Sequence, residues 1–237
     1  MILIILLSCI FDHIETATLS NAFPKCYQND PKLNECFVKA ANSLNDFVKN
    51  GVPEIGMRTL NPYVSSGFNI TLETPITDFA AYTTNFTLFK MYDYQFEEVD
   101  IRPKEGKISG KVVLPKWGLW TNYEILGQMI SVEVKGSGTV TCECDRTVCE
   151  FSLSNWFDTS NCKDINVDIV CKLDDMSINF TGMANEEVVN TLLNLSSRLF
   201  ASEVSPAFSS IFQGFMKQFT TRICRKFKFS ELIPPSP

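Results

Sequence analysis

Cysteine is the residue type with the greatest capacity for chemistry in this chain of 237 residues, which has nine cysteines and a single histidine. Cys9 and His13 fall within an apolar leader, so removal of the leader leaves eight cysteines and no histidine. An even number of cysteines in a secreted chain predicts disulfides. A metal site at Cys142, Cys144 and Cys149 is the alternative, but this spacing does not match the usual zinc pairs and no histidine could complete it. We therefore expect neither a metal nor a cofactor.

The same residue inventory excludes the common catalytic sites. Without histidine, the mature chain cannot assemble a Ser-His-Asp or Cys-His site. It also carries no G-x-S-x-G, P-loop, G-x-G-x-x-G or H-E-x-x-H motif. Asp174 and Asp175 are the remaining carboxylate pair, and adjacent acids in a turn are usually solvated. The sequence therefore predicts that the protein is not an enzyme.

Cys26 and Cys36 are natural disulfide partners, because one precedes a predicted helix and the other lies on it. The remaining cysteines can pair in many ways: they are Cys142, Cys144, Cys149, Cys162, Cys171 and Cys224. Cys142 and Cys144 would lie on the same side of a strand, which argues against a bond between them. A hairpin at Asp145–Arg146 would place Cys149 opposite one of these two. Cys224, near the end of the last helix, must reach back to the mid-chain cluster, and we expect all eight cysteines to form disulfides.

The amino terminus is typical of a secretion signal. Ile2 to Phe11 form an apolar run that is too short to span a bilayer and has the length of a signal sequence. Cleavage before Phe23, with other positions within 17–22 as alternatives, divides the chain into a signal peptide at 1–22 and one mature domain at 23–237. No other stretch is long and apolar enough for stable membrane insertion. We therefore expect a secreted, extracellular protein.

The charge balance limits the class of partner. The whole chain has a formal net charge of −6, and loss of Asp12 and Glu15 with the leader leaves the mature chain mildly acidic. Nucleic acids and anionic membranes both require a basic surface. We therefore expect no nucleic-acid partner and no electrostatic docking on membranes.

N-glycosylation sequences support secretion, at Asn69, Asn85, Asn179 and Asn194. Asn69 and Asn179 lie between apolar residues in alternating runs and should point away from the apolar face. Asn194 lies opposite the predicted apolar stripe of a helix, which consists of Val188, Leu192, Leu195 and Leu199. We expect these asparagines to carry glycans.

The elements that would position these residues begin with a helix after Cys26. Asp30 is placed to cap this helix and Pro31 to occupy its first turn. Asn50-Gly51 is a suitable C-terminal cap. Apolar residues recur between the caps with a helical period, at Leu33, Phe37, Ala40, Ala41, Leu44, Phe47 and Val48.

From Phe68 onward, apolar residues alternate with polar ones as they do in strands. Turns are predicted at Lys104–Lys107, at Asp145–Arg146 and at Asp174–Asp175, and the small residues Gly136–Gly138 predict a turn or bulge. Consecutive strands joined by turns imply a mainly antiparallel meander.

The last third of the chain is predicted to be helical. A helix from Glu186 to about Glu203 is followed by Pro206, which would kink or restart it. A bulky stripe then recurs at helical spacing, at Phe208, Ile211, Phe212, Phe215, Phe219 and Ile223. Such a helix needs a deep concave sheet to receive it. The pattern predicts an α+β fold in which a strongly curved antiparallel sheet is rolled around a long C-terminal helix.

The segment Cys26–Leu60 resembles the N-terminal signature of the insect takeout and juvenile hormone binding protein family, which has a cysteine, a polar run, Leu-Asn-x-Cys, an amphipathic helix and Gly-x-Pro-Glu. Asp100–Ile108 and Asn185–Phe229 are similar to later parts of that family in pattern. The resemblance implies an elongated fold of the tubular lipid-binding type, with a short N-terminal helix and an apolar internal tunnel. It also implies roles such as hormone transport or circadian output. The cysteines at Cys142–Cys171 depart from the family pattern and leave the subgroup open.

The resemblance implies a secreted, monomeric carrier of one small apolar ligand, such as a juvenile-hormone-like terpenoid, a fatty acid or a related lipid. Tyr63, Thr74 and Tyr123 are candidates to orient a polar ligand head. The candidates for lining the tunnel are Phe68, Ile70, Leu72, Phe86, Leu88, Trp117, Trp120, Tyr123, Phe180, Phe212, Phe215 and Phe219.

The main alternative is a disulfide-stabilised secreted protein with a filled core, which would bind a receptor or another secreted partner through the region Cys142–Cys162. A third hypothesis is extraction of membrane lipids, which predicts an exposed apolar rim at the tunnel mouth. A continuous apolar tunnel would favour the carrier, whereas native packing density throughout would favour the interaction protein.

Overall fold

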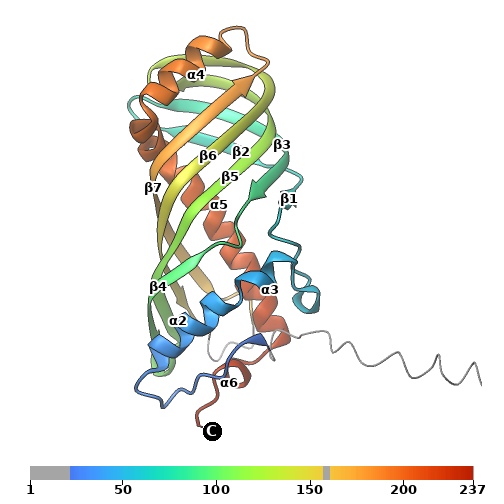
Figure 1. Ribbon diagram of the computed structural model, residues 1–237, viewed down its shortest axis with the longest axis vertical. Coiled ribbons are helices and arrows are strands. Elements are labelled where there is room, and N and C mark those ends of the chain that lie inside the picture. Colours follow the sequence, from blue (N-terminus) through green and yellow to red (C-terminus); the bar gives the residue numbers. More distant parts are fainter. Residues whose placement is uncertain (1–21, 157–160, 237) are drawn as a thin grey trace, which may run out of the picture.

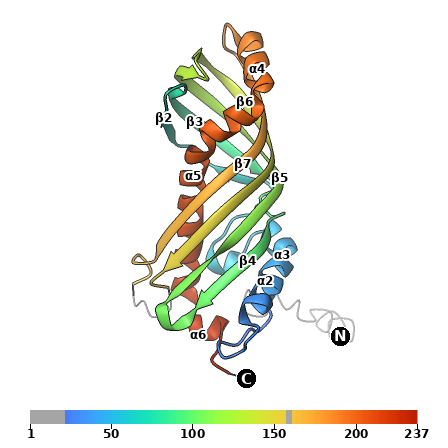
Figure 2. The ribbon, with the colours of Figure 1, turned by 90° about the vertical axis from the view of Figure 1, so that its left-hand side faces the viewer.

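The computed structural model of the protein describes residues 22–156 and 161–236 (Figure 1). The apolar run at 2–11, Cys9 and the rest of the expected signal peptide up to residue 21 lie outside the described residues. The described part is elongated, and a curved sheet and a long helix run along its length (Figures 1 and 2).

The element order confirms the predicted α+β class. The helices are α2 (Leu33–Ser43), α3 (Asn45–Lys49), α4 (Glu186–Leu195), α5 (Ser197–Lys226) and α6 (Phe229–Leu232), with short 3-10 turns η1 (Pro53–Ile55) and η2 (Pro103–Glu105). The strands are β1 (Tyr63–Ser65), β2 (Asn69–Glu73), β3 (Asp78–Phe89), β4 (Gln95–Arg102), β5 (Lys107–Met129), β6 (Val132–Ser154) and β7 (Asn166–Thr181).

The strands form one antiparallel sheet in the order β1-β3-β5-β6-β7. β3 and β4 pair with successive parts of the same edge of β5, and β1 and β2 do so with β3. β7 does not pair with β1 or β2, so the sheet is not closed. α5 runs along the open side (Figure 2) and contacts both β7 and β2. The predicted arrangement of a curved sheet around a long C-terminal helix is therefore confirmed.

The N-terminal helices agree with the predicted caps only in part. The expected N-cap at Asp30 is wrong, because α2 begins at Leu33 with Lys32 at its N-cap and no side-chain cap. Asp30 Oδ1 accepts a hydrogen bond of 2.8 Å from the Lys32 amide in the turn before the helix. The helix breaks at Leu44 and restarts as α3. Gly51 follows with φ 88°, and a Cβ at this position would lie 2.8 Å from the Thr59 nitrogen, so glycine is required.

The C-terminal helix does not break where the sequence predicts. Pro206 lies inside α5, and the chain instead breaks at Ser196, between α4 and α5. The proline removes the amide that would bond to the Ser202 carbonyl. Both residues are exposed, so water can satisfy that carbonyl. Of the two expected effects of Pro206, a kink or a restart of the helix, the restart is therefore wrong.

Two predicted turns are strand interiors. β6 continues through Asp145–Arg146, and β7 continues through Asp174–Asp175. In β6 the buried residues occupy even positions as far as Cys144 and odd positions from Thr147 onward. In β7 the buried residues change from odd positions, as far as Leu173, to even positions from Met176 onward. The predictions were wrong because two successive outward-facing polar residues within a strand have the same sequence pattern as a turn.

These changes of phase lie at one level of the sheet. The register pairs Lys116 of β5 with Asp145 of β6, and Asp145 with Asp175 of β7. Salt bridges connect the outward-facing groups, with 3.9 Å between Lys116 Nζ and Asp145 and 3.1 Å between Arg146 Nη1 and Asp174. In all three strands the inward-facing residues therefore switch between even and odd positions at this level. The inward-facing residues that follow still lie opposite one another across the sheet.

Of the remaining turn predictions, one is confirmed and one is wrong. η2 joins β4 to β5 at the expected turn of Lys104–Lys107. Gly136–Gly138 instead continues β6, in register with β5. A Cβ at Gly138 would lie 1.8 Å from the Thr181 carbonyl oxygen. Glycine is therefore present because β7 approaches closely, and the strand does not turn there.

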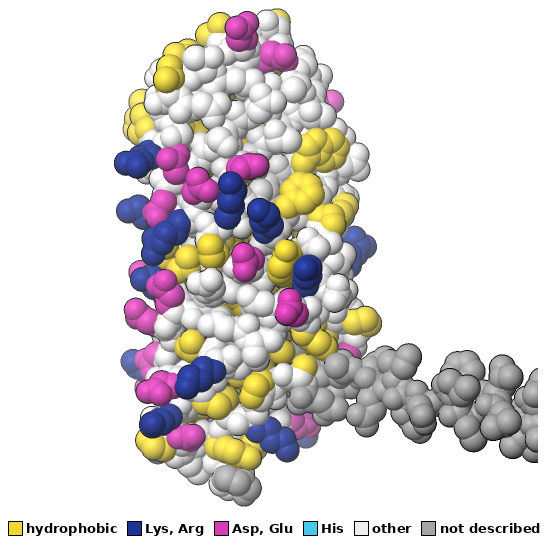
Figure 3. Space-filling view, in the orientation of Figure 1, with side chains coloured by type: hydrophobic (Ala, Val, Ile, Leu, Met, Phe, Trp, Pro, Cys, Tyr) yellow, Lys and Arg dark blue, Asp and Glu magenta, His cyan; other side chains and the backbone are white. Residues whose placement is uncertain are grey.

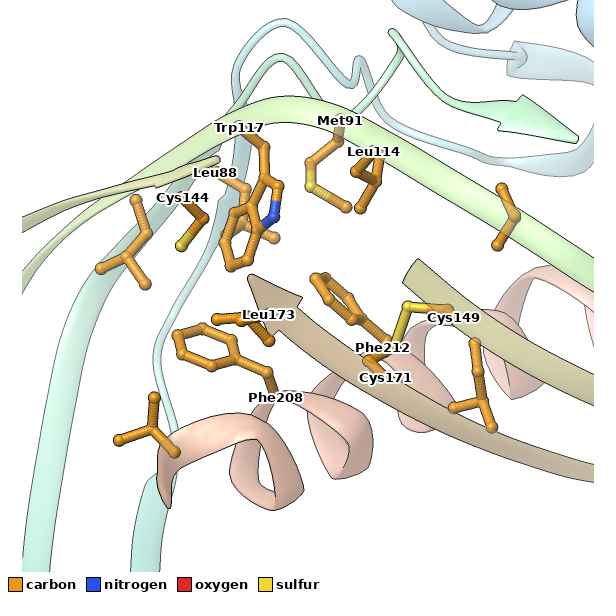
Figure 4. Packing of buried hydrophobic residues seen from close by; sticks show 14 of the residues in the cluster. Leu88, Met91, Leu114, Trp117, Cys144, Cys149, Cys171, Leu173, Phe208 and Phe212 are labelled. Carbon is orange, nitrogen blue, oxygen red and sulfur yellow. A yellow bond between two sulfur atoms is a disulfide. The ribbon is translucent and has the colours of Figure 1, made fainter. Parts of the chain in front are cut away.

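The middle of the molecule is filled by side chains from the sheet and from α5 (Figure 4). Trp117 is 1% exposed. Its ring meets Phe208 and Phe212 edge-on, with centroids 5.1 and 5.3 Å apart. Its Nε1 donates a hydrogen bond of 2.8 Å to the buried Thr147 hydroxyl. The indole of Trp117 is therefore part of the packed core.

Side chains of α4 and α5 close the free edge of β7. Asparagine amides and serine hydroxyls at helical spacing bond to the strand backbone, which would otherwise be unpaired. The pairs are Asn190 with Phe180, Asn194 with Ile178, Ser205 with Leu173 and Ser209 with Cys171. One edge of the sheet is thus bonded to the helices along most of its length.

The apolar stripe predicted to pack on the core is exposed instead. It consists of Val188, Leu192, Leu195 and Leu199, of which Leu195 is 79% exposed. The buried residues of α4 are Val189 and Leu193. α4 turns the face that carries Asn190 and Asn194 toward β7, because the strand edge needs hydrogen-bond partners. The prediction for this helix face is therefore wrong.

Candidate ligand-binding site

Two adjacent apolar pockets share part of their lining. They are lined in part by α2, α3 and α6, which lie in the same half of the molecule in Figure 1. One has a volume of about 140 Å³ and lies between α2, β4–β6 and the end of α5. The other has a volume of about 150 Å³ and extends under β5 and β7. Both are lined by Val48, Tyr94, Phe96, Met216 and Phe219. These side chains form the wall between the two apolar spaces.

The lining follows from the periodicity of each element. α2 and α3 contribute their apolar stripe, including Leu44 and Val48, and α5 contributes Met216 and Phe219. Tyr94 places a hydroxyl at the wall, where it donates a 3.2 Å hydrogen bond to the Ala41 carbonyl. Burial raises the pKa of Tyr94 well above its usual value, so the phenol stays neutral. The pockets therefore present an uncharged, almost wholly apolar surface.

An open seam separates the β1–β3 edge from α5. It holds a groove of about 400 Å³ and a polar pocket of about 270 Å³ that is lined by Arg58 and Arg222. Phe215 lines the groove, the polar pocket and the inner 150 Å³ pocket. Its ring packs edge-on against Tyr63, with centroids 5.2 Å apart. Phe215 therefore stands between the solvent-facing seam and the apolar interior.

The structure divides the predicted tunnel residues into three groups. Leu72, Trp117, Tyr123 and Phe180 are buried and line none of these four pockets. Trp120 is half-exposed on the face of β5 opposite Trp117. The candidates that do line a pocket are Phe68, Ile70, Phe86, Leu88, Phe212, Phe215 and Phe219. Within residues 22–156 and 161–236 the pockets remain separate, and they form no continuous tunnel.

The residues predicted to orient a polar ligand head differ in whether they line a pocket or are already hydrogen-bonded within the protein. Tyr63 lines both the groove and the polar pocket. The Tyr123 hydroxyl already donates to the Thr181 carbonyl at 3.2 Å, and burial raises its pKa. The Thr74 hydroxyl bonds to Glu203. Tyr63 is therefore the predicted polar group that the structure places at a pocket.

Sequence reasoning missed most of the inner lining. Phe96 belongs to β4 and Tyr94 directly precedes it, where polar neighbours obscure the alternation, and Met57 and Leu60 lie in irregular chain after η1. Met216 directly follows Phe215 but was not part of the predicted aromatic stripe. A search for apolar residues near the helix of Cys26–Leu60 would have found Met57 and Leu60, but it would not have shown that they face α5.

The disulfides agree in part with expectation. The structure contains Cys26–Cys36, Cys149–Cys171 and Cys162–Cys224. Cys26–Cys36 and the return of Cys224 to the mid-chain cluster agree with the predictions. Cys142 and Cys144 are buried free thiols, so the expectation that all eight cysteines are paired is wrong. Their register neighbours on β5 and β7 are Leu119, Ile178, Trp117 and Met176, none of which could form a disulfide.

We expect the Cys142 and Cys144 thiols to be unreactive in the folded protein. Burial raises the pKa of Cys142 to about 12, and burial also raises the pKa of Cys144. At pH 8 neither group then forms appreciable thiolate, which is the reactive species. Titration of the mature protein with DTNB should detect no fast-reacting thiol before unfolding and both free cysteines after unfolding without reductant. Rapid reaction of the native protein would contradict this assignment.

The predicted glycosylation sites differ in whether the asparagine side chain is exposed or hydrogen-bonded to the backbone. Asn69, Asn85 and Asn179 are exposed on β2, β3 and β7, and they remain predicted sites. The Asn194 Nδ2, which would carry the glycan, donates 2.7 Å hydrogen bonds to the carbonyls of Ile178 and Asn190. A glycan on Asn194 would disrupt the closure of the β7 edge.

The sequence profile described as Haemolymph juvenile hormone binding protein (JHBP) matches residues 2–234. The chain belongs to the JHBP family. No curated protein matches its sequence. The crystal structure of Takeout 1 from Epiphyas postvittana is similar to this JHBP-family chain with a TM-score of 0.69 and 15% identity, over 88% of this chain and 98% of Takeout 1. A lipopolysaccharide binding protein structure matches with a TM-score of 0.30 and 10% identity, over 75% of this chain and 39% of that protein.

Membership in the JHBP family confirms two expectations. The fold is that of Takeout 1, and the chain belongs to a family of binding proteins, not of enzymes. Among the described residues, no helix has the length and apolar character needed to cross a membrane. The same part of the chain contains no group of acidic, histidine and cysteine side chains suited to a metal ion. On the face shown in Figure 3, basic and acidic side chains are interspersed and no basic patch forms.

Proposed function

We propose that the protein is a secreted, monomeric carrier that holds one small hydrophobic ligand in the adjacent pockets between α2–α3, β4–β5 and α5. The observation that carries this proposal is the pair of almost wholly apolar pockets that share a wall. Membership in the JHBP family supports the same class of function. Three disulfides support an oxidising, extracellular compartment. Terpenoids, fatty acids and related lipids fit such a surface.

The volumes indicate how a ligand would fit. An apolar cavity of roughly 150 Å³ accommodates a molecule such as benzene, whereas drug-sized ligands usually occupy at least about 300 Å³. The pockets of about 140 and 150 Å³ would each take only part of a long chain. A ligand would therefore span both by displacing Met216 and Phe219, and methionine adapts readily to such changes. Each buried CH₂ would contribute about 0.8 kcal/mol before binding entropy is subtracted.

The alternative of a surface interaction through the cysteine region is less well supported. Cys142, Cys144 and Cys149 lie on β6 and are buried in the core, so these three side chains would not contact a surface partner. Among the described residues, the exposed apolar side chains open to a surface partner include the stripe Val188–Leu199 of α4 and α5. The carrier proposal is preferred because it explains the apolar pockets.

Native mass spectrometry of the protein secreted from eukaryotic cells, before and after organic extraction, tests the carrier. An apolar adduct that is lost on extraction is expected. Ile169 lines the inner pocket, so Ile169→Trp should fill it and weaken binding of a neutral apolar probe, N-phenyl-1-naphthylamine, by about tenfold or more. Val170→Trp, on the exposed face of the same strand, is the matched control and should bind as the unmodified protein does. Absence of both an adduct and probe binding would overturn the proposal.

A further inference from the structure

Two arginines line the polar pocket of the seam without carboxylate partners. Arg58 Nη1 lies 3.4 Å from the Val64 carbonyl oxygen, and Arg222 Nη1 donates to the Gly56 carbonyl. None of the ion pairs among the described residues involves either guanidinium. No acidic residue lines this pocket. In a chain with an acidic net charge, the pocket is therefore a local cationic site with unused hydrogen-bond donors.

The cationic pocket adjoins the apolar interior. Met57, Phe215 and Phe219 line both the polar pocket and the inner pocket of about 150 Å³. Phe219 also lines the further pocket of about 140 Å³. The order from solvent inward is therefore two guanidinium groups, a pair of aromatic rings and two apolar spaces. This order matches an amphiphile with a charged head and a long chain.

The seam is also the less strongly bonded side of the sheet. On the β7 side, side chains of α4 and α5 bond to the strand backbone at successive positions. On the other side, Thr74 bonds to Glu203 near one end, and Tyr63 contacts Phe215 through ring edges. Separating β1 from α5 would therefore break fewer hydrogen bonds than separating β7 from α5. Phe215 lines both the groove and the inner pocket, so rotation of its ring would connect the two spaces.

We propose that Arg58 and Arg222 bind the carboxylate of a long-chain anionic amphiphile whose alkyl chain passes Phe215 and Phe219 into the apolar pockets. Guanidinium groups bind carboxylates through charge-assisted hydrogen bonds that a neutral ester cannot reproduce. This inference rests on the proposed carrier function and narrows its ligand to the class of long-chain carboxylates.

The test compares laurate with methyl laurate, which have the same acyl chain and differ in head charge. Each ligand displaces N-phenyl-1-naphthylamine from the mature protein at pH 8, below the concentration at which laurate forms micelles. Laurate should bind about tenfold more tightly than the ester, as expected for a charge-assisted contact. The preference should shrink in high salt, because the carboxylate lies at the solvent-facing end. Equal affinities would overturn the headgroup site while leaving the carrier intact.

Arginine variants test whether Arg58 and Arg222 cause the preference for laurate over methyl laurate. Arg58→Gln and Arg222→Gln should each reduce the laurate preference, and the double variant should abolish it without changing the affinity for methyl laurate. Arg225→Gln removes the same charge from an exposed position near the end of α5 and should leave the preference unchanged. An equal loss with Arg225→Gln would overturn the assignment, because net charge would then explain the preference. If neither ligand nor the probe binds the unmodified protein, the carrier function itself fails.

Discussion

Replacing Trp117 by alanine is expected to lower the free energy of unfolding by about 3–5 kcal/mol, as large-to-small changes at aromatic core positions do. The indole is 1% exposed and contacts the rings of Phe208 and Phe212. Its loss also leaves the hydroxyl of Thr147, which is 0% exposed, without the donor 2.8 Å away. Urea unfolding followed by far-ultraviolet circular dichroism measures the change.

Trp120→Ala is the matched control for this prediction. Trp120 is three positions further along β5 but lies half-exposed on the outer face, so its removal should cost about 1 kcal/mol or less. Trp117→Phe should fall between the two, because it keeps an aromatic ring and loses the hydrogen bond. If Trp117→Ala is no more destabilising than Trp120→Ala, the centre of the sheet is not packed as described.

Removal of the Cys162–Cys224 disulfide by a double serine substitution should also destabilise the protein strongly. The bond spans a sequence separation of 62 and joins the segment before β7 to the last turns of α5. By the loop-entropy argument, such a cross-link contributes roughly 4 kcal/mol. Urea unfolding measures the loss, and hydrogen exchange should show earlier opening of the end of α5, where Met216 and Phe219 form the pocket wall.

The Cys26–Cys36 bond provides the comparison. Its sequence separation is only 10, so the double serine variant should lose about 3 kcal/mol on the same argument. It should also leave exchange in α5 unchanged, because the bond lies on the other side of the pockets. A larger loss for Cys26–Cys36 than for Cys162–Cys224 would show that native contacts outweigh loop entropy here.

Local patterns predicted the elements that depend on neighbouring residues. Gly51 follows the end of α3 with φ 88°, where a C-terminal cap was expected, because capping involves groups only a few positions apart. The alternation of apolar and polar residues from Phe68 onward predicted strands because it, too, depends only on neighbouring residues. The class of fold followed from the order of these elements, and the resemblance of Cys26–Leu60 to the juvenile hormone binding protein family agrees with the match over residues 2–234.

Patterns failed where a distant partner decides which face of an element is buried. The stripe Val188–Leu199 is apolar, yet α4 turns Asn190 and Asn194 toward β7, since the strand edge needs donors and acceptors. Asp145–Arg146 has the composition of a turn, yet β6 continues because β5 and β7 change phase at the same level. Neither partner is visible in the local sequence.

The sequence by itself predicted most of the elements, their order and the Cys26–Cys36 disulfide, since these depend on residue type and short spacing. Only the tertiary structure decided how the cysteines beyond Cys26 and Cys36 pair, which aromatic residues are core and which line a pocket. Phe215 and Trp117 have the same apolar character in the sequence, but one faces an open seam and the other a filled core. The physical reason is that a cavity depends on the packing of several elements at once, and periodicity describes one element at a time.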